Sequence, residues 1–204
     1  MKKVLLFTIF SFISIACFNS CSKDDSGNST SSGKGVVING VTWATCNVDK
    51  PGTFAANPED AGMFYQWNRK TAWATTGGVT DWDNSIPNGN AWAKSNDPSP
   101  AGWRVPTWAE IQKLCDNSKV RNEWTTQNGI SGVKFTDSNT GNSIFLPAVG
   151  IREDSGNPVA NDGYYWSNTA DGTNGAWGMI LQSGLADGDG FTRDSGCCVR
   201  PVAQ

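Results

Sequence analysis

Residues 99–115 read SPAGWRVPTWAEIQKLC, and the order of residue types in this stretch defines where a helix begins. Pro106 keeps the residue before it extended, because the proline ring disfavours helical backbone at the preceding position. Thr107 and Glu110 have the spacing of a capping box, in which each side chain accepts a hydrogen bond from the other's backbone N–H. We therefore predict a helix that starts at Trp108.

The predicted helix has one apolar face. Its large apolar residues recur at the spacing that places side chains on one side of a helix. They are Trp108, Ile111, Leu114 and Cys115. We interpret this stripe as core-facing rather than as a ligand site.

Two arginines stand beside prolines at opposite ends of the predicted domain. Arg104 lies two residues before Pro106, and Arg200 directly precedes Pro201. A catalytic role is one interpretation of Arg104. We favour a semi-buried structural role for both arginines, because a planar guanidinium can donate to several carboxylate or carbonyl oxygens at once.

Short β-like segments make up most of the chain outside this helix. The stretch VVINGVTWATCNV at 36–48 predicts a hairpin around Asn39–Gly40, a dipeptide that fits a tight turn. The stretch PEDAGMFYQWNRK at 58–70 has apolar residues at helical spacing, so we predict a second short helix there. Further strands are predicted in GVKF, SIFLPAVGI, GYYWSNT, AWGMILQ and CCVRPV. The predicted fold class is α+β, with two helices ahead of a mostly antiparallel sheet.

Residues 71–100 show no sustained hydrophobic period, so they predict a long loop. Loops of this length in compact domains are often functional. Trp73, Trp82 and Trp92 lie in this loop, and indole faces can stack on sugar rings or anchor protein contacts. We expect these indoles to form a ligand surface, with packing of the loop onto the domain as the alternative.

Composition excludes several classes of protein. The chain has 204 residues, which favours one domain, and a net charge of −3 without a basic cluster, which argues against nucleic acid as a partner. It contains no histidine, so it lacks the usual general base near neutral pH and the commonest zinc ligand. Catalysis would have to use carboxylates or cysteines, and we predict that the protein is not an enzyme.

The first residues predict an export signal. Two lysines precede an apolar run from Val4 to Phe18, which is too short for a convincing membrane span. We therefore predict that the mature protein leaves the cytoplasm. Residues 1–20 form the predicted signal peptide, and residues 36–204 form the predicted single domain.

Two cysteines at the end of the apolar run are candidates for lipid attachment. We favour Cys21 over Cys17, because a small Ser20 precedes it and a polar tether at 21–35 follows it. An ordinary cleaved signal that leaves both cysteines without a role is the alternative. The sequence CSKDD, which begins at Cys21, also resembles the lipoprotein surface-export signal of the Bacteroidota. That resemblance implies a surface-exposed protein of the outer membrane, attached to the membrane only through its lipid.

Four more cysteines lie in the predicted domain. An even number in an exported domain suggests two disulfides. Cys197 and Cys198 are adjacent, so in a strand their side chains point to opposite faces, and each is expected to bond a different partner. The partners are then Cys46 and Cys115, and the sequence leaves open which bonds with which.

Several blocks of sequence, taken in order, resemble one protein family. They are TWATCNV, FYQWN, DPSPAGWRVPTWAEIQKL, LPAVGIRE, GYYWSNT and GCCVRPV. In this order they resemble the Fibrobacter succinogenes major paralogous domain over nearly all of residues 40–204. The resemblance implies a C-type-lectin-like fold, distantly similar to the formylglycine-generating enzymes. In such folds the first and last strands pair, and a long loop region supplies the binding surface.

The same resemblance suggests a calcium site. Many C-type lectins hold calcium through a Trp-Asn-Asp strand end, and YYWSNTADG is similar in place, with Trp166, Asn168 and Asp171. Calcium takes roughly six to eight oxygen ligands. The further acidic candidates are Asp162, Asp187 and Asp189. Because Asp-Gly pairs also serve ordinary turns, plain turns are the alternative to a calcium site.

These features together predict a non-catalytic binding module on the cell surface. We expect it to recognise a glycan or a surface protein through its Trp- and Asp-bearing loops. A structural or accessory subunit of a surface assembly, such as an adhesin or pilus tip component, is the alternative. An oxidase like the formylglycine-generating enzymes is a third interpretation, but the closing GFTRDSGCCVRP lacks the spaced pair of cysteines of that family.

Overall fold

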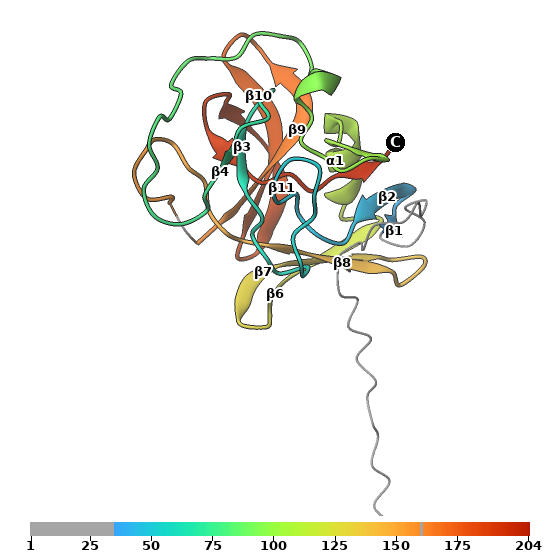
Figure 1. The fold of residues 1–204 in the computed structure, drawn as a ribbon. Helices are drawn as coiled ribbons and strands as arrows, with labels where there is room; N and C mark the ends of the chain where they lie inside the picture. Colours follow the sequence, from blue (N-terminus) through green and yellow to red (C-terminus); the bar gives the residue numbers. More distant parts are fainter. Residues whose placement is uncertain (1–34, 160) are drawn as a thin grey trace, which may run out of the picture.

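The structure is a computed structural model that describes residues 35–159 and 161–204 (Figure 1). The predicted signal peptide, Cys17, Cys21 and the tether up to residue 34 lie outside the described residues. Within the described part of the chain, no helix has the length and apolar character needed to cross a membrane.

The described chain folds into four small antiparallel sheets (Figure 1). From edge to edge, one sheet contains β1 (Gly35–Ile38), β2 (Val41–Ala44), β13 (Val202–Ala203) and β5 (Trp103–Arg104). Another contains β12 (Gly196–Cys197), β3 (Phe64–Gln66) and β4 (Ala72–Trp73). A third contains β6 (Val120–Gln127), β7 (Ile130–Asp137) and β8 (Ser143–Pro147). The last contains β11 (Leu185–Thr192), β10 (Gly175–Gln182) and β9 (Gly163–Asp171). The helical segments are α1 (Trp108–Leu114) and the short 3-10 helix η1 (Lys94–Asn96).

This architecture corrects the predicted fold class. α1 is the single α-helix of residues 35–159 and 161–204, so the domain is mostly β rather than the predicted α+β, C-type-lectin-like arrangement with two helices. The predicted helix at 58–70 is instead a series of turns around strand β3. All three residues of β3 are buried, and β3 pairs with β12 and β4 on its two sides. A short strand buried on both faces shows no alternation of polar and apolar residues, so its sequence cannot be distinguished from a helical pattern.

The predicted N-terminal hairpin is confirmed. β1 and β2 pair with Ile38 opposite Val41, which leaves Asn39 and Gly40 as the two turn residues. Their φ angles are 45° and 76°, the left-handed backbone that Asn and Gly adopt most easily and that this turn type requires. The last strand, β13, pairs with β2 and β5 rather than with β1, so the pairing of first and last strands that the family resemblance implied is wrong, although both strands belong to one sheet.

The predicted start of α1 is also confirmed. Thr107 Oγ1 accepts from the backbone N–H of Glu110, and the Glu110 carboxylate accepts from the N–H of Thr107. The Arg104 guanidinium donates to both carboxylate oxygens of Glu110, at 2.7 and 2.8 Å. Burial raises the pKa of Glu110, but the hydrogen bonds from Arg104 and Thr107 outweigh it and hold the pKa below its ordinary value. Arg104 therefore has the structural role that the sequence predicted.

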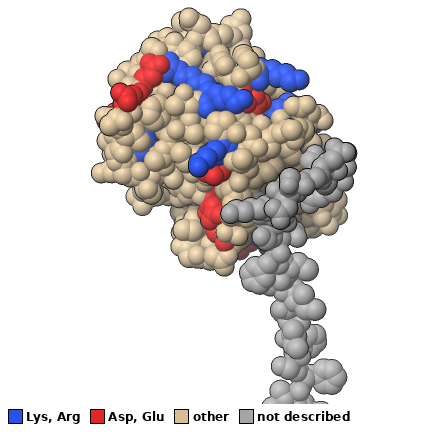
Figure 2. Space-filling model, in the orientation of Figure 1, with Lys and Arg blue, Asp and Glu red and all other residues tan. Residues whose placement is uncertain are grey.

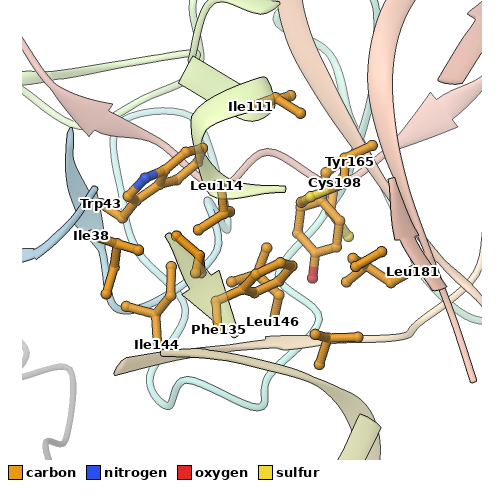
Figure 3. Packing of buried hydrophobic residues seen from close by; sticks show 14 of the residues in the cluster. Ile38, Trp43, Ile111, Leu114, Phe135, Ile144, Leu146, Tyr165, Leu181 and Cys198 are labelled. Atoms are coloured by element: carbon orange, nitrogen blue, oxygen red, sulfur yellow. The ribbon is translucent and has the colours of Figure 1, made fainter. Parts of the chain in front are cut away.

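The larger of two main hydrophobic cores lies where α1 meets the β6–β7–β8 sheet and the β9–β10–β11 sheet (Figure 3). Ile111 and Leu114 of α1 are buried in it, together with Phe135 of β7 and Leu181 of β10. The other two residues of the predicted helix stripe, Trp108 and Cys115, pack against this core but remain half-buried. The stripe therefore faces the core as predicted, with its two ends at the margin.

The cysteines correct a second prediction. Cys197 and Cys198 point to opposite sides, as predicted, and each lies in a different core. However, Cys115, Cys197 and Cys198 are all free thiols, so the predicted disulfides between these residues and Cys46 do not form. Burial raises the pKa of Cys115 and of Cys198 to about 12. These thiols pack as small apolar groups rather than as reactive ones.

Arg200 is buried without an ion-pair partner among the described residues. Its guanidinium donates to Asn47 Oδ1 at 2.9 Å and to the carbonyls of Ala44 and Thr45 at 3.3 and 2.6 Å. Burial lowers its pKa to about 10, so the group stays charged at neutral pH. Arg200 thus joins the end of the chain to the segment that follows β2, in the structural role predicted for it.

One carboxylate connects the first hairpin to the β7–β8 turn. The Asp137 side chain accepts from the backbone N–H of Asn39 at 2.7 Å and from those of Asn139 and Thr140 at 2.9 Å each. These backbone hydrogen bonds, that of Asn39 foremost, lower the pKa of Asp137. The charged form of this carboxyl is therefore the one that holds the two turns together.

We expect Asp137→Asn to make the stability of the domain less sensitive to acid. A carboxyl whose pKa is depressed by folding stabilises the native state above its unfolded pKa of about 4 and loses this contribution as the pH falls through the folded pKa. The variant should unfold at lower urea concentration at pH 7, and its midpoint should fall less steeply below pH 4 than that of the parent. Urea unfolding followed by tryptophan fluorescence at stepped pH measures both effects. Glu123→Gln, at an exposed position of β6, is the control. If the urea midpoint of the Asp137 variant falls with pH as steeply as that of the parent, the carboxylate does not have this role.

Candidate functional site

A hollow of about 420 Å³ opens between the 79–84 segment and the 154–155 turn. Its lining combines one indole with carboxylate, amide and hydroxyl groups, and it includes no lysine or arginine. The lining residues are Val79, Thr80, Asp81, Trp82, Asn84, Asp154 and Ser155. We call this hollow the groove.

A buried arginine holds the two sides of the groove together. Arg152 donates to the carbonyls of Ala74 and Gly77 on one side, each at 2.7 Å, and to the carbonyl of Gly156 on the other. Burial lowers the pKa of Arg152, and no carboxylate in the described part of the chain forms an ion pair with it. The guanidinium therefore serves as a cross-link between two loops that share no strand.

Trp82 forms the apolar floor of the groove. It is 8% exposed, and its ring packs on that of Trp73 with centroids 5.0 Å apart. The far end of the ring lies against Gly196, where an added Cβ would stand 3.0 Å from Cη2. Its Nε1 is buried and has no hydrogen-bond partner within the described residues. Trp82 thus lines the groove with the small part of its side chain that is exposed, while its N–H stays buried without a partner among the described residues.

Polar contacts from Gln66 of β3 and from Arg69 just after it hold the end of the 79–84 segment. Arg69 forms an ion pair with Asp83 and donates to the carbonyl of Ser85 at 2.8 Å. Gln66 Nε2, which is fixed in a fully buried strand, donates to the carbonyl of Asp83 at 2.6 Å. The segment that lines the groove is therefore anchored on both sides of Trp82.

The two groove carboxylates remain available to a ligand. Asp81 is exposed and forms no ion pair with any described residue. Asp154 Oδ1 accepts from the N–H of Gly156 at 2.6 Å, which leaves its second oxygen to a ligand. The sequence did not single out either residue. Both stand in polar turn segments, TDWDNS and EDSGNP, but nothing in these local patterns shows that the two turns face each other.

The predicted ligand aromatics are mostly covered by the domain. Trp92 is 7% exposed and Trp166 is 0% exposed, with Trp166 Nε1 donating to the Tyr65 carbonyl at 2.7 Å. Trp73 is half-buried and faces Trp82. The predicted outward position is therefore wrong for both Trp82 and Trp92, and Trp166 is fully buried as well. Of the predicted aromatics, Trp82 alone lines the groove.

The four acidic residues predicted to bind calcium do not converge. Asp162 and Asp171 lie at opposite ends of β9. Asp187 and Asp189 lie on β11, where each accepts from the N–H of the glycine that follows it. Asn168, the remaining predicted ligand, uses its backbone to join β9 to the residues before α1. Across residues 35–159 and 161–204, no group of three or more His, Cys, Asp or Glu residues is placed to hold a metal ion.

Comparison of this chain with protein-family models, with curated proteins and with solved structures finds no match. The resemblance to the Fibrobacter succinogenes major paralogous domain therefore stays a prediction.

We expect Arg152→Lys to loosen the groove. Lysine keeps the charge, but its single ammonium cannot replace all of the guanidinium's hydrogen bonds to the three carbonyls, so at least one of them is lost. Hydrogen exchange at the backbone N–H of Val79, which donates to the Ser155 carbonyl at 2.8 Å, should become faster. The conservative change Arg121→Lys, at an exposed position of β6, is the control. Exchange at Val79 that matches the control would show that Arg152 does not hold this loop.

Proposed function

We propose that this protein is a non-catalytic binding module whose groove takes a neutral, hydroxyl-rich ligand such as a glycan. The lining of the groove is the observation that carries this proposal: the Asp81 and Asp154 carboxylates and the Asn84 amide surround the exposed part of Trp82, without a cation among them. A sugar presents many hydroxyl donors next to apolar C–H surfaces. Carboxylates and amides accept hydrogen bonds from hydroxyls, and an indole covers the apolar part.

The rigidity of the groove supports a binding role. Arg152 links the residues before the 79–84 segment to the 154–155 turn, and Gln66 and Arg69 hold the end of that segment, through hydrogen bonds that exist without a ligand. A site that is already ordered loses little conformational entropy when a ligand binds, so modest contacts suffice for useful affinity.

The distribution of charge also fits a neutral ligand. On the face drawn in Figure 2, lysines and arginines gather mainly across the upper part, with acidic residues between and beside them. A polyanion such as nucleic acid is held mainly by a concentrated basic surface, which this face does not offer. The groove itself is acidic, which disfavours phosphorylated or sulfated ligands.

Affinity measurements on groove variants test this proposal. A glycan array probed with the purified full-length protein identifies a ligand, and titration then gives dissociation constants. Asp81→Ala and Asp154→Ala should each raise the dissociation constant about tenfold or more, as expected for loss of a charged acceptor worth about 1.5 kcal/mol. Glu123→Ala, exposed and far from the groove in sequence, should leave the affinity unchanged. Parent-like affinity in both groove variants, or no glycan bound by the parent, would count against the proposal.

We also propose that the domain works at the cell surface, held to the outer membrane by a lipid on Cys21. The support is the apolar N-terminal run, Ser20 before the cysteine, and the polar residues that follow it. Metabolic labelling with a radioactive fatty acid should mark the parent and Cys17→Ala but not Cys21→Ala. Label retained in Cys21→Ala would reassign the anchor, and label absent from the parent would remove it.

A further inference from the structure

A second feature of the surface lies away from the groove, at the start of α1. Trp108 of α1 and Trp177 of β10 stack with ring centroids 4.9 Å apart and planes 18° from parallel. Both residues are half-buried, so the pair stands at the edge of the domain rather than inside it. Neither indole N–H donates to a described residue, and neither nitrogen is buried. The stack thus presents aromatic surface and two N–H groups to solvent.

Glycines on β11 make room for this pair. A Cβ on Gly188 would stand 1.8 Å from Cη2 of Trp108, so the edge of that indole rests directly on the strand backbone. Gly190, two residues along the strand, is the cross-strand partner of Trp177. This part of β11 therefore has no side chain that covers the indoles.

A carboxylate completes the feature. Oδ2 of Asp171 lies 2.8 Å from the position that a Cβ would take on Gly190, so Asp171 and Trp177 border the same backbone position. Asp171 forms no ion pair within residues 35–159 and 161–204. Arg193, which lies under the same turn, donates instead to the carbonyls of Gly172 and Gly175. Asp171 thus lies beside the half-buried indoles without forming an ion pair with any described residue.

We propose that Trp108, Trp177 and Asp171 form a second binding site, which takes an organic cation: an alkylammonium or guanidinium group. The faces of indole rings attract cations electrostatically, and an unpaired carboxylate adds to that attraction. Asp187 and Asp189, exposed on the same β11 strand, make the local potential more negative. A neutral sugar could stack on the indoles and donate a hydroxyl to Asp171, whereas a cation is attracted by the ring faces and by the full charge of the carboxylate. Such a cation reaches the protein either as a lysine or arginine side chain of a partner or as a quaternary ammonium head group.

Nuclear magnetic resonance of the indole N–H groups tests this site in the full-length protein. The resonances of Trp108 and Trp177 are assigned with Trp108→Phe and Trp177→Phe. Titration with N-acetyl-lysine amide, N-acetyl-arginine amide and choline should shift these two resonances selectively, with dissociation constants in the range of about 1 mM or above, as fits a small cation at an exposed site. A shift with the amino-acid amides alone identifies a partner side chain, and a shift with choline alone identifies a quaternary ammonium group.

The charge of Asp171 provides the decisive comparison. Asp171→Asn keeps the shape of the side chain and should weaken cation binding at least threefold, while Asp81→Ala in the groove should leave it unchanged. Added sodium chloride should also weaken binding, because the attraction is electrostatic. The proposal is overturned if the cations shift all tryptophan resonances alike, if galactose shifts the same two resonances as strongly, or if Asp171→Asn binds cations like the parent.

Discussion

Three buried arginines without ion-pair partners in the described chain hold the irregular parts of this domain together. Arg152, Arg193 and Arg200 each donate to backbone carbonyls from at least two separate segments. Sheets of three or four short strands leave many loop carbonyls without a ladder partner, and a buried carbonyl left unpaired costs about 1–3 kcal/mol. A guanidinium offers five N–H donors in a fixed plane, so one arginine can satisfy carbonyls from several directions. The hydrogen bonds of these arginines therefore allow a region made mostly of loops to pack closely without leaving its carbonyls unpaired.

The groove depends on hydrogen bonds from two of these arginines. Arg152 bonds the beginning of the 71–100 segment, and Arg193 bonds the carbonyl of Pro87 at 2.9 Å while its guanidinium lies 4.4 Å from the centre of the Trp67 ring. The segment is therefore fixed at points on both sides of Trp82, and the part between them has a defined shape without strand pairing. A binding surface made from loops usually has to be ordered at the moment of binding. Here the arginines order it in advance, which is why the groove and not the indole faces is the better candidate for recognition.

The parts of the structure that the sequence predicted correctly are those fixed by neighbours in the chain. The hairpin turn at Asn39–Gly40 and the capping box of Thr107 and Glu110 each depend on residues within four positions of one another. The errors concern long-range burial: β3 resembles a helix because both of its faces are buried, in two different cores, and Trp92 resembles a surface residue because its loop has no period. The groove could not be predicted, since it is formed when the 79–84 segment meets the 154–155 turn, which lies about 70 residues further along the chain. The free cysteines follow the same rule, because adjacency showed their opposite directions but not what surrounds them.

The abundance of tryptophan and of glycine in this chain has a common physical cause. The sequence contains 10 Trp and 23 Gly, and short strands provide few aliphatic side chains for a core. One indole buries about 150–250 Å² of surface, so a few tryptophans can replace the missing aliphatic contacts. An indole needs space on the facing strand, and Gly196 and Gly188 provide it for Trp82 and Trp108. In both places the indole that fills the space lies at the margin of the domain, beside an aspartate with no ion-pair partner among the described residues. The packing of indoles against facing glycines therefore stabilises the small sheets. It also produces the two surfaces at which aromatic and carboxylate groups meet solvent.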